Sequence, residues 1–229
     1  MKTLNVLSLL ILVMTSLASN LVLAAHEDSL QIFPQLKRSK KVISGFADFL
    51  VSAQSEVVLS EESYIQNSIN NESALLNQLT AADVQASGPE CLDFIRTSTN
   101  LLVNLAGISY TNCFNDVDTR MFEELSRFPE LALTREAYDQ FSLLGVFRGE
   151  NIFIDPIKIR DKLLARLGAR VSMPTLNPET EATLRAVLGG LKTNFLACMN
   201  SSQTKLADNL QYTSEQVRAI CAAEATKHI

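Results

Sequence analysis

The sequence contains no tryptophan and only two histidines, His26 and His228, which stand near opposite ends of the chain. Chain ends are usually frayed, whereas Ser-His-Asp catalysis, Cys-His catalysis and histidine metal ligation all need a rigidly held imidazole. The chain also lacks the G-x-S-x-G, H-E-x-x-H, Walker-type and G-x-G-x-x-G motifs. These absences predict a protein that is not an enzyme, and they assign no catalytic, cofactor-binding or metal-ligating residue.

An excess of positive charge is also missing. The chain has 20 Lys and Arg against 25 Asp and Glu, which gives a formal net charge of −5. A mildly acidic chain with mixed charges has no electrostatic footprint for nucleic acid. Beyond residue 24 no apolar run reaches the roughly 18–20 residues that a membrane-spanning helix needs. We therefore expect no nucleic-acid partner and no membrane span.

The N-terminus has the pattern of a secretory signal peptide. Lys2 is followed by an apolar run from Leu4 to Val22, and Val22-Leu23-Ala24 is an acceptable small-residue cleavage site. Residues 1–24 are therefore predicted to be removed, which leaves a secreted, extracellular chain that starts at Ala25. Loss of one lysine changes the formal charge from −5 to −6.

Cysteine is scarce but regularly placed. The four cysteines form two pairs with intervals of 22 and 23 residues: Cys91 and Cys113, then Cys198 and Cys221. In an oxidising compartment they are predicted to form disulfides rather than a zinc site. On a continuous helix a step of 22 residues spans about 33 Å, so Cys91 and Cys113 could bond each other only if the helix breaks, for example at Gly107.

Three disulfide connectivities remain open. A ladder between two antiparallel helices would join Cys91 to Cys221 and Cys113 to Cys198. Local pairing would join the two members of each pair, and crossed pairing would join Cys91 to Cys198 and Cys113 to Cys221. The ladder has an imperfect helical phase, because 23 residues at about 100° each leave the sulfurs of Cys198 and Cys221 about 140° apart.

Apolar residues recur with a helical period through nearly the whole chain. The sequence predicts an all-α, disulfide-braced helical bundle with a long N-terminal helical arm. The arm covers residues 25–86, with one long helix or two from about Leu36 to Ala82 and a slip in the rhythm near Ser60. Ser87-Gly88-Pro89 ends the arm, and a four-cysteine helical domain follows at residues 87–229.

Finer boundaries within the four-cysteine domain follow from local signals. A helix opens at Pro89, and its apolar face is predicted to include Cys91, Ile95, Leu102, Leu105 and Cys113. A second helix is predicted from Val117, with Asp116 or Asp118 as its N-cap, since the spacing of these acids with Glu123 and Glu124 does not fit an EF-hand loop. Thr213 with Gln216 forms a capping box, which allows a break before Cys221.

Two sequons, Asn71-Glu72-Ser73 and Asn200-Ser201-Ser202, mark Asn71 and Asn200 as candidate N-glycosylation sites. Glycosylation at either position would require that the side chain faces solvent.

The segment Glu90-Cys91-Leu92-Asp93-Phe94, followed by Tyr110-Thr111-Asn112-Cys113, resembles the start of the insect TsetseEP-domain family. In that pattern a cysteine followed by an acidic and an aromatic residue precedes a second cysteine, which has a tyrosine three residues ahead of it. The resemblance covers Cys91 to Cys221, and the chain departs from the pattern in a long middle insertion, Arg120 to Pro178. The resemblance implies a small secreted insect protein of the gut or another body fluid, and it carries over no catalytic residue.

Two functions are therefore expected. The first is a non-enzymatic interaction or structural protein of an insect extracellular fluid (gut, hemolymph, saliva or reproductive tract), with an unknown protein or surface partner. Its arm would pack on the bundle or on a second copy, forming a homodimer. The alternative is an extracellular carrier of a lipid or small hydrophobic ligand. An enclosed apolar cavity of several hundred Å³ would favour the carrier.

Overall fold

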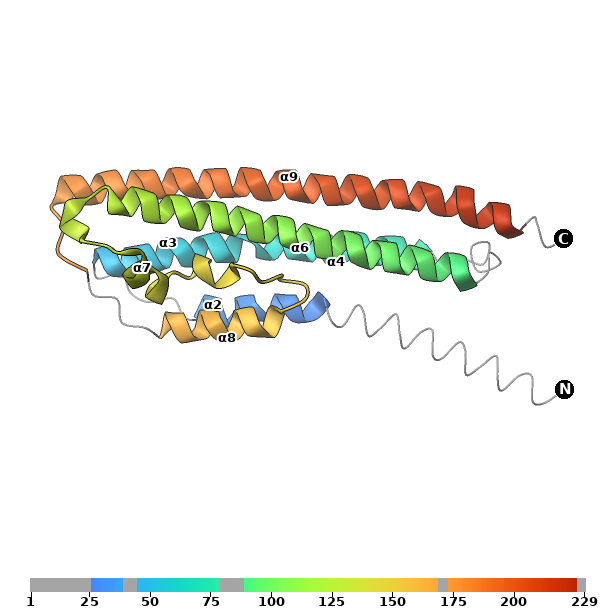
Figure 1. The fold of residues 1–229 in the computed structure, drawn as a ribbon, viewed down its shortest axis with the longest axis horizontal. Helices are drawn as coiled ribbons and strands as arrows, with labels where there is room; N and C mark the ends of the chain where they lie inside the picture. The colour runs from blue at the N-terminus through green and yellow to red at the C-terminus, as the bar shows by residue number, and fades with distance from the viewer. Residues whose placement is uncertain (1–25, 39–44, 79–88, 169–172, 226–229) are drawn as a thin grey trace.

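The computed structural model describes residues 26–38, 45–78, 89–168 and 173–225. Within these ranges the protein is an all-α, disulfide-braced helical bundle without strands. Figure 1 shows an elongated molecule in which the longest helices lie side by side and shorter helices pack along them. Among the described helices, none is long and apolar enough to cross a bilayer.

Two long antiparallel helices, α6 (Pro89–Ser126) and α9 (Pro178–Ala225), run along the length of the bundle (Figure 1). At 1.5 Å per residue they are about 57 Å and 72 Å long. On each of these two helices, apolar residues at helical spacing form the buried side. In α6 these are Val103, Ala106, Tyr110, Phe114, Val117, Met121 and Leu125, and in α9 they are Leu184, Leu188, Leu191, Phe195, Met199, Leu206 and Leu210.

The N-terminal arm consists of η1 (Asp28–Gln31), α2 (Ile32–Arg38), α3 (Phe46–Ser60) and α4 (Glu62–Gln78). The helical rhythm was predicted to slip near Ser60, and the break between α3 and α4 lies at Glu61. The arm packs on its own chain, because its buried residues join α6 and α9 in one hydrophobic core. The expected boundary between residues 86 and 87 lies outside the described residues.

The chain between α6 and α9 contains η2 (Pro129–Leu131), α7 (Arg135–Phe141), η3 (Leu144–Phe147) and α8 (Pro156–Leu167). It folds back along α6. A buried carboxylate on α6, Asp118, holds it there: Arg135 and Arg148 donate to its Oδ2 at 2.9 Å and 2.7 Å, and Tyr138 and Ser142 donate to its Oδ1.

One predicted helix start is wrong, and one helix break that the sequence had left open does not occur. Asp116 and Asp118 do not cap a new helix, because α6 continues without a break from Pro89 through Gly107 to Ser126. Helix α9 likewise continues past Thr213, whose hydroxyl donates to the carbonyl of Asn209 one turn earlier. Asp118 instead binds side chains of the segment that follows α6, and the Thr213 hydroxyl bonds within its own helix, so neither side chain caps a helix start. Helix α9 has a side-chain cap at its start, where Asn177 Oδ1 accepts from the Thr180 amide at 2.8 Å.

Candidate functional site

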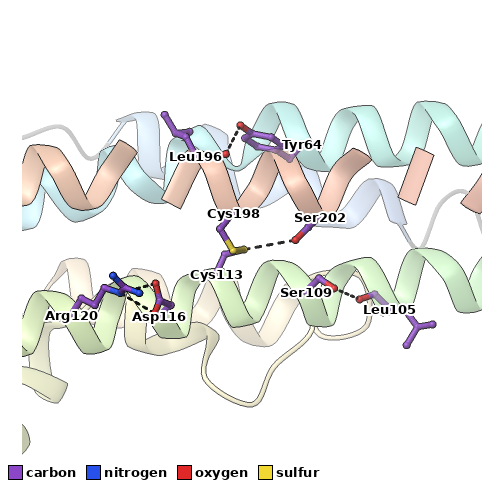
Figure 2. The surroundings of a disulfide bond; sticks show 9 residues. All are labelled: Tyr64, Leu105, Ser109, Cys113, Asp116, Arg120, Leu196, Cys198 and Ser202. Atoms are coloured by element: carbon purple, nitrogen blue, oxygen red, sulfur yellow. Dashed lines mark hydrogen bonds and ion pairs between the residues drawn. A yellow bond between two sulfur atoms is a disulfide. The ribbon is translucent and has the colours of Figure 1, made fainter. Parts of the chain in front are cut away.

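A disulfide joins Cys113 on α6 to Cys198 on α9, with the two Cα atoms 5.8 Å apart (Figure 2). This bond excludes the local and the crossed connectivities, since both pair Cys113 with another cysteine. Aromatic residues stand next to both cysteines in the sequence, because Phe114 follows Cys113 and Phe195 precedes Cys198 by three residues. The ring centroids of Phe114 and Phe195 lie 4.8 Å apart, and Phe114 also stacks on Phe147 with a centroid distance of 3.8 Å. Of the two bonds in the predicted ladder, the inner one, Cys113–Cys198, is therefore confirmed.

The second bond of the ladder, between Cys91 and Cys221, stays a prediction; we call it the outer rung. Cys91 is buried in a small cluster with Ile95 and Val217, and it is disulfide-bonded. The side chain of Cys221 lies outside the described residues. Val217 stands one turn before Cys221 on α9, so the described part of the chain already brings this end of α9 against Cys91.

The two sequons lie within helices. Asn71 on α4 is half-buried and lines a shallow groove of about 250 Å³ between α4 and α9. Asn200 on α9 is exposed, although its Oδ1 accepts a hydrogen bond from the Tyr64 hydroxyl at 3.0 Å. A glycan therefore has more room at Asn200 than at Asn71.

His26 is not frayed, which corrects the expectation for the chain end. Its side chain is buried, its Nδ1 lies 2.6 Å from Glu72 Oε2, and its ring meets the edge of Phe153 at 5.4 Å. Sequence reasoning missed this pair because the partner lies 46 residues away. The other histidine, His228, lies outside the described residues.

Three of the four carboxylates between residues 115 and 124 are paired with arginines. Asp116 pairs with Arg120 one turn along α6 at 2.9 Å (Figure 2), Glu124 pairs with Arg127, and Asp118 is held by two arginines as described above. Among the described residues no group of three or more candidate metal ligands lies together.

A strip of exposed apolar side chains runs along the outer face of α6. Phe94, Leu101, Leu105 and Ile108 are 61%, 57%, 48% and 49% exposed. They follow one another at intervals of seven, four and three residues, which places them on one side of the helix. In Figure 2 the Leu105 side chain points away from α9. We call these four residues the α6 strip.

The α6 strip corrects the predicted face of this helix. Leu105 was expected on the buried side with Cys91 and Cys113, but the buried arc is turned toward Tyr110 and Val103. The cause is a second neighbour: α4 packs on α6 beside α9, and Ser68 of α4 hydrogen-bonds the Tyr110 hydroxyl at 2.8 Å. Leu105 therefore faces out.

A second apolar surface lies at the start of α8, where an open groove of about 790 Å³ runs between this helix and η1. Its apolar lining includes Ile154 and Ile157, which are 60% and 54% exposed, and its rim carries charged residues. The lining residues are Asp28, Phe153, Ile154, Asp155, Pro156, Ile157, Lys158, Asp161, Lys162 and Ala165.

The loop before α8 crosses α6 next to the α6 strip and is fixed by hydrogen bonds. Thr111 donates to the Glu150 carbonyl at 2.6 Å, and Asn151 Nδ2 donates to the Asn104 carbonyl at 2.8 Å. Gly107 makes this approach possible, since a Cβ there would lie 2.1 Å from Asn151 Oδ1 and 2.9 Å from the Phe153 ring.

We expect Gly107→Ala to lower the free energy of unfolding by about 1–3 kcal/mol, because the added methyl group overpacks the contact with the loop. The matched control is Gly190→Ala on α9, where a Cβ would have no neighbour within 4 Å. That substitution should stabilise the protein by about 1 kcal/mol, the usual helix-propensity gain. Denaturant unfolding measures both changes, and equal stabilisation by the two variants would contradict the close approach.

The molecule is thus a helical bundle with a disulfide between its two longest helices and two exposed apolar surfaces. Comparisons of the chain with protein-family models, with curated proteins and with solved structures found no match.

Proposed function

We propose that the protein is a secreted, non-enzymatic interaction protein that binds a protein partner through the α6 strip. The observation that carries the proposal is the strip itself: four apolar side chains, each about half-exposed or more, lie in line on a rigid helix. Together they form a patch of roughly a few hundred Å², comparable with the largest apolar patch on a typical soluble domain, and such patches are often functional.

The proposal also includes the place where the protein acts, an extracellular fluid of an insect. The resemblance of Cys91 to Cys221 to the TsetseEP-domain family supports an extracellular fluid of an insect, such as gut fluid, hemolymph, saliva or reproductive fluid. Disulfide bracing supports an oxidising compartment. The buried ionisable groups Asp118 and His26 support a non-enzymatic role, because their partners hold helices together rather than face an open cleft.

Photo-crosslinking from inside the strip tests this function. A photoreactive phenylalanine at Leu105 should form covalent adducts with protein when the folded chain is irradiated in its native fluid. The same group at Tyr212, which is 63% exposed on α9, is the control. Excess unlabelled protein should suppress the adduct at position 105. Protein adducts no stronger at position 105 than at position 212 would contradict the proposal.

The α8 groove favours a second candidate, a carrier of a small hydrophobic ligand. Its floor is apolar, but it is open to solvent, whereas a carrier usually encloses most of its ligand. Native mass spectrometry of the oxidised, secreted protein separates the two functions. We expect no mass of a bound small molecule beyond that of the protein and its glycans. Additional mass that is removed by solvent extraction, and that Ile157→Asp abolishes, would favour the carrier.

A further inference from the structure

Three of the four residues of the α6 strip are evenly spaced along the helix. Phe94, Leu101 and Ile108 are separated by seven residues on either side of Leu101. A seven-residue apolar repeat drifts by only about 20° per step around an α-helix, and such repeats form the seams between paired helices. The three side chains therefore make a seam of about 21 Å along the outer face of α6.

The charge pattern is equally specific. From Thr97 to Asn115 the chain contains no Asp, Glu, Lys or Arg, a stretch of 19 residues. The nearest charges are Glu90 and Asp93 before the seam, Arg96 between Phe94 and Leu101, and Asp116 after the seam. Outer faces of helices are normally rich in charge, so this face differs from an ordinary solvated surface.

We propose that the occupant of the α6 strip is a second copy of this chain, related by a twofold axis that passes beside Leu101. This inference rests on the proposed function, namely that the strip binds protein, and it names the partner. In the antiparallel pair, each residue meets the residue whose number brings the sum to 202. Leu101 then meets Leu101 of the second copy, Phe94 meets Ile108, and Leu105 meets Thr97.

The polar ends of the strip agree with this register. Asp93 meets Ser109 and Glu90 meets Asn112, so no two carboxylates of the two copies are brought together. Like charges at an interface would cost several kcal/mol and would suppress pairing. An isologous contact of this kind closes on itself, so the assembly stops at two copies.

The size of the α6 strip determines how strongly the two copies are expected to bind each other. A patch of roughly a few hundred Å² is smaller than the roughly 800 Å² per partner that specific, stable complexes typically bury. We therefore expect a reversible dimer that forms at micromolar concentration and dissociates on dilution. It differs from the predicted dimer through the N-terminal arm, since the arm is packed on its own α6 and α9.

Sedimentation equilibrium on the purified, oxidised protein tests the inference. The average mass should rise from monomer to dimer with concentration and go no further. Leu101→Asp places two carboxylates face to face at the axis, and it should raise the dissociation constant at least about 100-fold. Tyr212→Asp introduces the same charge at an equally exposed position on α9 and should leave the dissociation constant unchanged. Circular dichroism establishes that both variants are folded.

A photoreactive phenylalanine at Phe94 tests the register. The crosslinked dimer should yield a peptide that joins position 94 of one copy to the region of Ile108 in the other. A wild-type protein that stays monomeric up to about 100 μM, or crosslinks that map away from α6, would overturn the inference. If crosslinking from position 105 then captures a different protein, the proposed function survives without the second copy. If it captures none, both fail.

Discussion

Replacing Cys113 and Cys198 together by alanine should lower the free energy of unfolding by about 4 kcal/mol. The bond closes a loop with a sequence separation of 85 residues, and loops of this length lose the most chain entropy on cross-linking. The packing of Phe114 against Phe195 and Phe147 remains, so the variant should keep its helical content while its stability falls. Denaturant unfolding followed by circular dichroism measures the difference.

The double variant is the right comparison, because a single replacement leaves an unpaired thiol that could exchange with the remaining cysteines. Reduction of the wild-type protein should reproduce the loss in the same direction. A double variant as stable as the oxidised wild type would show that the bond is not closed in the native protein, or that α6 and α9 are already held together in the unfolded chain.

The outer rung has its own test in the same series. If Cys91 is bonded to Cys221, replacing both should cost little more than replacing either alone, since the first replacement already removes the bond. Strictly additive losses would contradict the pairing. The experiment also bears on the α6 strip. Cys91 stands three residues before Phe94 on α6, so the Cys91–Cys221 bond would hold the end of the helix that carries Phe94.

The cysteine spacing predicted more of the architecture than any single motif did. Two intervals of nearly equal length fit antiparallel helices joined by matching rungs, and the Cys113–Cys198 bond confirms one rung. The phase mismatch of about 140° between Cys198 and Cys221 does not affect this bond, because a single rung needs only one point of contact between the helices.

Helix boundaries and the exposed face could not be predicted, because residues far apart in sequence decide them. Judged from its sequence neighbours alone, Asp118 is a good candidate for a helix N-cap. Its actual partners, Arg135 and Arg148, follow 17 and 30 residues later. A contact with Ser68, 42 residues before Tyr110, turns α6 so that Leu105 faces out. The uncharged stretch from Thr97 to Asn115 was the available signal for the strip, since a helix facing water on one side rarely lacks charge over five turns.

The second large effect concerns Glu61, the residue between α3 and α4. Its side chain is fully buried, and neither carboxyl oxygen has a hydrogen-bond partner in the described structure. Burial raises the pKa of this carboxyl well above its usual value, because the charged form loses its hydration. Burial also raises the pKa of the Tyr110 hydroxyl to about 12, and the nearby charge of Glu61 adds to that shift.

The sign of the pH dependence follows from this direction. At a pH below the ordinary glutamate pKa of about 4.3, Glu61 is protonated in both states and contributes no pH-dependent change in stability. As the pH rises, the unfolded chain releases the proton while the folded chain retains it, so the protein loses stability. The loss approaches about 1.4 kcal/mol per pH unit and continues until the pH passes the folded-state pKa. Glu61→Gln, which stays neutral, removes this contribution.

We therefore expect Glu61→Gln to match the wild type near pH 4 and to become progressively more stable than it as the pH increases. Unfolding free energies at several pH values between 4 and 8 measure the widening difference. Glu56→Gln is the matched control, since Glu56 lies on the surface of α3 beside Lys192 at 3.0 Å. A difference between Glu61→Gln and wild type that does not change with pH would mean that Glu61 keeps its charge in the folded protein. Such a charge would need a partner or water within the core, because an isolated buried carboxylate is too costly to persist.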